Sequence, residues 1–172
     1  MTVYIFMGVS GSGKTTLGQA ASAALGQCFI EGDDLHSPLS IAKMTANVPL
    51  NDDDRAPWSD ALLAAIAQTK TTSNAPHIFV ACSALSKALR TKLRHGLHGD
   101  VVFLHLRGEL HTIKRRILGR KGHFFKVPML AGQFTALEMP RRAVDLDITL
   151  PVDQQIEIVA KIIADREAKA KG

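Results

Sequence analysis

The sequence predicts an α/β fold with three layers, in which helices cover both faces of a five-stranded parallel sheet. Short apolar, β-rich runs alternate along the chain with stretches of helical spacing. Such alternation produces a parallel sheet, because neighbouring parallel strands must be joined by crossover helices. The 172 residues, 46% of them hydrophobic and 22% charged, suit a single domain spanning 1–172, and no linker or internal repeat divides them.

The five strands are expected at residues 3–7, 28–30, 77–81, 101–106 and 145–148. A helix beginning near Lys14 follows the first strand, and a helix from 152 to about 169 closes the sheet. Ligands of such sheets bind at the carboxyl ends of the strands. Functional residues are therefore expected in the loops that follow the strands.

Two connections are longer than a crossover requires. Segment 31–76 contains Pro38, Pro49 and Pro57, which are expected to break it into two or three helices. Segment 107–144 holds a basic helix, the turn RKGHFFK at 120–126 and a further helix. Long excursions at the ligand end of a sheet are often lids or substrate-binding flaps. We therefore expect a substrate-binding insertion at about 31–76 and a lid at about 116–128.

Composition excludes several other classes. Cys28 and Cys82 are far apart and have no metal-ligand spacing, so neither a disulfide framework nor a zinc site is expected. No run approaches the roughly 20 apolar residues of a membrane span, and the apolar start continues into glycines instead of a signal-peptide cleavage site. A cytoplasmic protein without membrane contact is expected. A net charge of +5 indicates an anionic partner, which leaves nucleotides, nucleic acids and acidic metabolites open.

Residues 8–15, GVSGSGKT, match the phosphate-binding pattern G-x-x-x-x-G-K-[ST] between an apolar strand and an amphipathic helix. Glycines let the backbone amides turn inward around phosphate, the helix N-terminus adds positive potential, and the lysine reaches the outer phosphates. An ordinary glycine-rich turn is the alternative, and the flanking strand and helix argue against it. The residues expected to bind a nucleoside triphosphate here are Gly8, Ser10, Gly11, Ser12, Gly13, Lys14, Thr15 and Thr16, with Thr15 as the Mg²⁺ ligand.

Carboxylate placement separates the classes of P-loop protein. ATPases and GTPases usually carry a Mg²⁺-associated aspartate at the end of a later strand, but the third and fourth strands here end without an acid. Acids instead follow the second strand, where Asp33 and Asp34 place a carboxylate beside the phosphates. This favours phosphoryl transfer to an alcohol. A role in capping the next helix is the alternative for each aspartate.

Residues 51–58, NDDDRAPW, contain three adjacent aspartates. Helix initiation explains them better than a metal site, because acids at a first helical turn satisfy free N–H groups and no calcium-loop spacing follows. Arg55 at the same helix start suits a substrate carboxylate or phosphate. Its alternative is an ion pair with Asp52 or Asp53.

Further basic residues are expected near the crevice. Ser83, Lys87 and Arg90 follow the third strand. Arg116 and Arg120 are four residues apart, so both project from one helical face, where cations can neutralise phosphate charge during transfer. A solvated basic helix is the alternative, and it applies better to Lys114 and Arg115.

The sequence resembles the gluconokinase family. The motifs that carry the resemblance cover nearly the whole chain in matching order, and they are GVSGSGKT, GDDLH at 32–36, PLNDDDR at 49–55, CSAL at 82–85, RKGHFFK and QF-x-x-L-E-x-P at 133–140. The resemblance implies ATP- and Mg²⁺-dependent phosphorylation of D-gluconate at its 6-hydroxyl. It also implies a P-loop fold like that of the nucleoside-monophosphate kinases, commonly as a homodimer.

Carried over position by position, the resemblance assigns roles to residues of this chain. Asp33 matches the aspartate of G-D-x-L-H, which orients or deprotonates the acceptor hydroxyl, while Asp34 falls on the variable position. The catalytic residues are then expected to be Lys14, Asp33 and Arg120. Gluconate is expected to contact Asp33, His36, Arg55, Arg90, Lys121 and His123, and the lid is expected to cover the phosphates with Arg116, Arg120, Lys121 and His123. Ser86 and Leu89 depart from the usual lysine and tyrosine beside the acceptor pocket.

Two other functions are compatible with parts of this pattern. A related kinase could use shikimate, another aldonic acid or a nucleoside monophosphate, because Arg55 and Arg90 suit any small anion. The basic stretch 114–126 is superficially compatible with nucleic acid. Only 5% of residues are aromatic and no nucleic-acid-binding module is present, so no nucleic-acid partner is expected.

Overall fold

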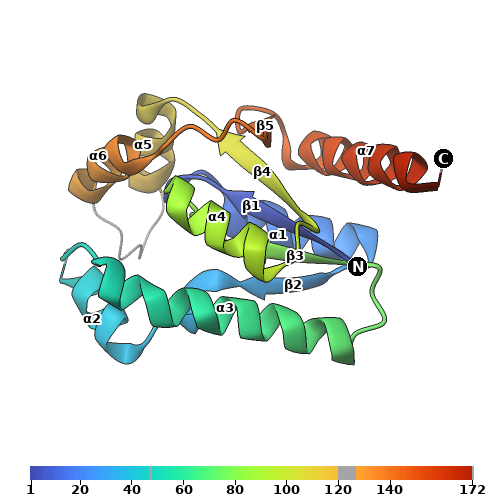
Figure 1. The fold of residues 1–172 in the computed structure, drawn as a ribbon. Helices are drawn as coiled ribbons and strands as arrows, with labels where there is room; N and C mark the ends of the chain where they lie inside the picture. The colour runs from blue at the N-terminus through green and yellow to red at the C-terminus, as the bar shows by residue number, and fades with distance from the viewer. Residues whose placement is uncertain (47, 120–126, 172) are drawn as a thin grey trace.

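The computed structural model describes residues 1–46, 48–119 and 127–171. Its five strands form one parallel sheet in the order β2-β3-β1-β4-β5 (Figure 1). In chain order the elements are β1 (Thr2–Met7), α1 (Lys14–Leu25), β2 (Cys28–Glu31), the 3₁₀ turn η1 (Gly32–Leu35), α2 (Pro38–Thr45), α3 (Asp52–Thr72), β3 (His77–Ala81), α4 (Lys87–Gly96), β4 (Val101–Arg107), α5 (Leu110–Leu118), α6 (Val127–Ala136), β5 (Ala143–Asp147) and α7 (Val152–Lys171).

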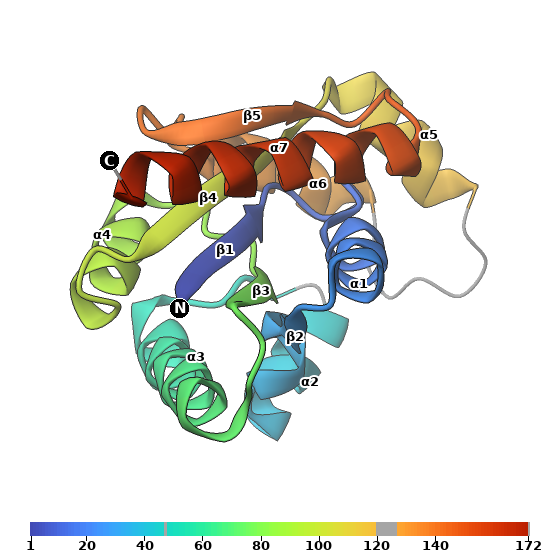
Figure 2. The same cartoon turned by 90° about the vertical axis from the view of Figure 1, so that its right-hand side faces the viewer.

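Helices cover both faces of the sheet, as Figures 1 and 2 show. Helices α1 and α7 pack on one face, and α3 and α4 pack on the other. Helices α2, α5 and α6 lie at the end of the molecule where the strands terminate (Figure 1). The predicted three-layer α/β architecture is confirmed.

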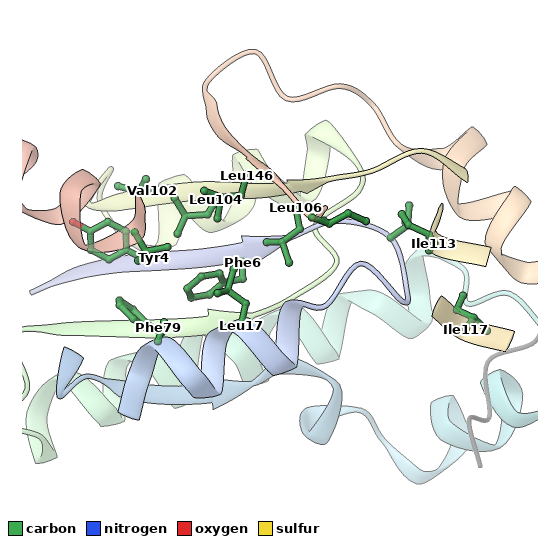
Figure 3. Packing of buried hydrophobic residues seen from close by; sticks show 14 of the residues in the cluster. Tyr4, Phe6, Leu17, Phe79, Val102, Leu104, Leu106, Ile113, Ile117 and Leu146 are labelled. Atoms are coloured by element: carbon green, nitrogen blue, oxygen red, sulfur yellow. The ribbon is translucent and has the colours of Figure 1, made fainter. Parts of the chain in front are cut away.

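The central strand β1 divides the core into two clusters because successive side chains point to opposite faces. Tyr4 and Phe6 contribute to the cluster under α1 and α7, part of which is drawn in Figure 3. Val3, Ile5 and Met7 contribute to the cluster under α3 and α4. All five side chains are almost fully buried. This rigid strand ends where the phosphate-binding loop begins.

The predicted strands are all present, and the differences lie at their ends. Strand β5 begins and ends before the predicted 145–148, because it pairs with β4 from Ala143 to Asp147. Pro57 does not break a helix but lies inside α3. Asn51 caps the N-terminus of this helix ahead of the proline, and Trp58, Leu62 and Ile66 are buried on the inner face of the helix. Within the described ranges, no helix has both the length and the apolar composition needed to cross a membrane.

Candidate active site

The phosphate-binding loop joins β1 to α1 at the carboxyl end of the sheet. The amide of Gly8 donates to the Ser83 carbonyl across 3.1 Å, which ties the start of this loop to the end of β3. Gly11 has a φ of +80°, and a Cβ there would lie 2.6 Å from Cγ1 of Ile117. Only glycine fits this position without displacing α5. The loop therefore has the conformation that the motif predicted.

Lys14 begins α1, and its ammonium group bends back to donate to the Val9 carbonyl across 3.2 Å. Burial lowers its pKa, and the negative charges of Asp33 and Glu31 partly oppose that shift. The neighbouring Cys82 thiol stays neutral, since burial raises its pKa to about 12. Lys14 thus lies at the loop with carboxylates close to it.

Those carboxylates come from the end of β2. Glu31 is half-buried, accepts a hydrogen bond from the amide of Asp33 at 3.3 Å, and thereby caps η1. Burial raises the pKa of Glu31, while a hydrogen bond from Thr15 and the charge of Lys14 act in the opposite direction. The side chain of Asp33 is exposed. The prediction that acids after the second strand lie beside the loop is confirmed by these contacts.

The segment after Asp33 forms an aromatic corner. The rings of His36 and Trp58 stack with their centroids 4.9 Å apart and an interplanar angle of 7°. The indole N–H of Trp58 donates to the Gly32 carbonyl at 2.7 Å. Burial lowers the pKa of His36, and the charge of Arg55 lowers it further while that of Asp33 raises it. Asp33 and Arg55 therefore both lie close enough to His36 for their charges to act on its pKa.

The run of three aspartates initiates α3. Asn51 and Asp54 form a reciprocal capping box, with the Asn51 side chain accepting from the Asp54 amide at 2.9 Å and Asp54 accepting from the Asn51 amide at 3.0 Å. Asp54 also pairs with Lys43 of α2 at 2.6 Å. Arg55 pairs with Asp52 at 3.5 Å, and both side chains are exposed. Helix initiation is confirmed as the role of this run. Within the described residues, no cluster of three or more His, Cys, Asp or Glu side chains is arranged to hold a metal ion.

Arg116 of α5 lies against the phosphate-binding loop, as predicted. Its guanidinium donates to the Ser12 carbonyl at 3.4 Å and also to the Ile148 carbonyl. Both acceptors are uncharged backbone groups, and the guanidinium lies beside the phosphate-binding loop.

Arg90 lies apart from this cluster. It is only 5% exposed, and its guanidinium donates to the backbone carbonyls of Ala84, Leu85 and Glu138 at 2.8, 2.7 and 2.6 Å. The guanidinium is occupied by the loop after β3, so the geometry does not support the expected contact with substrate. Two departures from the family pattern are also structural, since Ser86 caps α4 by accepting from the Leu89 amide and Leu89 packs against the core.

Several unsatisfied polar atoms gather at the site. Within the described residues, the buried side-chain atoms without a hydrogen-bond partner are Ser12 Oγ, Glu31 Oε2, His36 Nδ1 and one atom elsewhere, His77 Nδ1. Buried polar atoms are normally paired, so this concentration indicates a ligand site. Thr16 is exposed in the first turn of α1. Three predicted site residues, Arg120, Lys121 and His123, lie outside the described residues.

Sequence reasoning did not assign two residues that the structure brings to the loop. Glu31 was visible in the acidic run but was not assigned a role. Gln133 of α6 accepts a hydrogen bond from the Ser10 amide at 2.6 Å. The available signal was the motif QF-x-x-L-E-x-P, which marks Gln133 without stating what it contacts.

Comparisons with known proteins identify the family of this chain. A family model described as an AAA domain matches residues 3–145. The thermoresistant gluconokinase of Escherichia coli K12 is 40% identical over 94% of this chain and 91% of its own length, and the thermosensitive gluconokinase of that strain is 44% identical over 80% and 72%. The crystal structure of a gluconokinase from Sinorhizobium meliloti 1021 has a TM-score of 0.76 at 37% identity and covers 96% of each chain.

The fold and the site together define a P-loop kinase that uses ATP to phosphorylate an alcohol. The phosphate-binding loop supplies the nucleotide site, and the acids that follow β2 lie close enough to Lys14 to act on its pKa. The matches extend over most of the chain and of the relatives. The chain belongs to the gluconokinase family.

Proposed function

We propose that this protein transfers the γ-phosphoryl group of ATP to the 6-hydroxyl of D-gluconate, giving 6-phosphogluconate and ADP. One observation supports the proposal beyond family membership. The charge of Asp33 acts on the pKa of both Lys14 and His36, so Asp33 lies close to both. A carboxylate is thus shared by the phosphate site and by a polar corner that suits a hydroxylated acceptor. Segment 31–76 would form most of the acceptor site.

Each residue of this corner has a distinct task. Asp33 accepts the proton of the 6-hydroxyl as that oxygen attacks the γ-phosphorus, and the bond from phosphorus to the β,γ-bridging oxygen breaks. The lowered pKa of His36 keeps its imidazole neutral, so it can hydrogen-bond sugar hydroxyls without adding charge. Arg55 binds the carboxylate of gluconate, because its exposed 3.5 Å pair with Asp52 is weak and readily exchanged.

Magnesium fits the oxygen donors beside the loop. Glu31 has a buried carboxylate oxygen without a partner, and its pKa reflects a hydrogen bond from the Thr15 hydroxyl. Hard oxygen donors of this kind suit Mg²⁺, which takes one or two protein groups and completes its shell with phosphates and water. Thr15 would hold the ion, with Glu31 beside it. A bound Mg²⁺ ion neutralises charge on the phosphates, while Lys14 and Arg116 add fixed positive charge.

A coupled assay tests the acceptor. ATP is supplied with D-gluconate, other aldonic acids, shikimate and nucleoside monophosphates in turn, and the product is identified by mass and its phosphate position by NMR. We expect D-gluconate to have the highest kcat/KM and the product to carry phosphate at position 6. A higher kcat/KM for any other acceptor would refute the assignment while leaving the kinase class intact.

The Arg55→Ala variant tests the carboxylate contact. Loss of a charged hydrogen-bonding partner should raise KM for gluconate roughly tenfold or more and leave KM for ATP nearly unchanged. The matched control is Arg141→Ala, which removes an exposed arginine that has no part in the proposed site. An equal rise in both KM values would indicate that Arg55 only supports the start of α3.

We further propose that the enzyme acts as a cytoplasmic homodimer, as its relationship to the gluconokinases suggests. Sedimentation velocity of the purified protein would measure the mass of the assembly. A monomer throughout the concentration range of catalysis would contradict the dimer.

A further inference from the structure

Gln133 of α6 contacts the phosphate-binding loop but has no role in the proposed chemistry. It lies on α6, 123 residues after the loop position that it contacts, and its Oε1 accepts the Ser10 amide at 2.6 Å. Figure 1 shows α6 beside α5 at the end of the molecule where the strands terminate. The side chain is half-buried, so it is neither a core residue nor a freely solvated one.

The hydrogen bond fixes which way the carboxamide faces. A backbone N–H can only donate, so the oxygen of Gln133 must point at Ser10 and the NH₂ group must point away. No acceptor among the described residues takes a hydrogen bond from that nitrogen. The hydrogen bond therefore holds a side-chain NH₂ donor beside Ser10.

The end of α6 is firmly anchored, which keeps Gln133 in place. The amide of Glu138 donates to the Leu85 carbonyl at 3.1 Å, and its carboxylate accepts from the Lys87 amide. The Glu138 carbonyl accepts from Arg90 at 2.6 Å. Phe134 and Leu137 pack against the core cluster. The motif QF-x-x-L-E-x-P therefore fastens α6 to the loop after β3 and directs one carboxamide at the phosphate-binding loop.

The contact lies at the outer-phosphate end of that loop. The lysine of this motif reaches the β- and γ-phosphates, and the ammonium of Lys14 lies at the Val9 carbonyl, one residue before Ser10. The inner phosphates instead meet the amides at the start of α1. A donor held at Ser10 would therefore lie closer to a bound γ-phosphate than to the inner phosphates.

We propose that the amide nitrogen of Gln133 donates a hydrogen bond to a γ-phosphate oxygen of ATP. This contact makes Gln133 a residue that distinguishes ATP from ADP, because ADP has no phosphate at that position. The inference rests on nucleotide binding by the kinase and not on which acceptor is used.

Calorimetric titration of the whole enzyme with ADP and with a non-hydrolysable ATP analogue, each with Mg²⁺ and without acceptor, tests this role. Gln133→Ala should weaken the analogue roughly tenfold or more while ADP affinity changes less than about twofold. Gln133→Glu keeps an acceptor for the Ser10 amide but faces the γ-phosphate with an anion, so it should weaken the analogue further. Thr135→Ala, on the exposed side of the same helix, is the matched control and should change neither affinity.

The ratio of the two affinities decides the outcome. Equal weakening of ADP and the analogue would assign Gln133 to loop structure and overturn the proposal. Unchanged or tighter binding of the analogue would also overturn it, since the carboxamide would then only compete with phosphate for the Ser10 amide. Thermal melts confirm that each variant is folded before titration. Because no acceptor is present, none of these results depends on gluconate.

Discussion

Replacement of Arg90 by methionine distinguishes a structural arginine from a substrate-binding one. Its guanidinium makes three hydrogen bonds to backbone carbonyls on two segments of the chain. Methionine keeps most of the aliphatic stem but makes none of these bonds. At about 1 kcal/mol for each net hydrogen bond, the loss is about 3 kcal/mol of unfolding free energy. For a chain of this size that corresponds to a fall in Tm of roughly 6–12 °C.

Urea unfolding and gluconate kinetics, measured on the same preparations, separate the two roles. Arg90→Met should shift the urea midpoint strongly and leave KM for gluconate within about threefold once rates are expressed per folded enzyme. Arg141→Met, at an exposed arginine, should stay within about 0.5 kcal/mol of the parent. A variant of normal stability whose KM rises tenfold or more would refute the structural role and restore Arg90 to the acceptor site.

Three further predictions probe the site. Asp33→Asn should lower kcat by about 10²–10⁴-fold with ATP binding nearly unchanged, whereas Asp34→Asn should alter kcat less than roughly tenfold; steady-state kinetics would contradict the assignment if Asp34 proved the more sensitive. Glu31→Gln should raise the Tm of the free enzyme at neutral pH but not at acid pH. Burial raises the pKa of Glu31 in the folded protein. The free energy of unfolding therefore falls as the pH rises above the pKa that Glu31 has in the unfolded chain, and glutamine removes that fall. Melts with the same pH dependence as the parent would refute this. Gly11→Ala should weaken ATP roughly tenfold or more, since φ is +80° and the new methyl would lie 2.6 Å from an isoleucine of α5. In the control Gly26→Ala, φ is +63° but the space is open, and nucleotide titration should show no change.

The strands and the phosphate-binding loop could be predicted because their signals are local. An apolar run followed by GVSGSGKT specifies a strand, a glycine-rich turn and a helix within fifteen residues. The acids after β2 also followed from local order, since carboxyl ends of parallel strands meet at one edge of the sheet. Strands β1, β2 and β4 are each one residue longer than predicted. The larger differences are the limits of β5 and the continuation of α3 through Pro57, and both depend on packing partners elsewhere in the chain.

The contacts of Arg90 and Gln133 could not be predicted because their partners are distant in the sequence. A guanidinium binds a carbonyl as readily as it binds a carboxylate, and the Glu138 carbonyl that accepts from Arg90 lies 48 residues away in the sequence. Gln133 meets its partner across 123 residues. Spacing within a motif contains no information about contacts at such separations. The position of Arg90 after the third strand and the family resemblance therefore assigned it to substrate, and Gln133 stayed unassigned.

Trp58 gives the enzyme an internal optical probe, because it is the only tryptophan in the sequence. Its indole is stacked on His36 and hydrogen-bonded to Gly32, the residue immediately before Asp33. Tryptophan emission therefore reports on the surroundings of His36 and Gly32 and on no other part of the molecule. Gluconate entering beside His36 would change the polarity around the indole, so acceptor occupancy can be followed by fluorescence in the unlabelled protein.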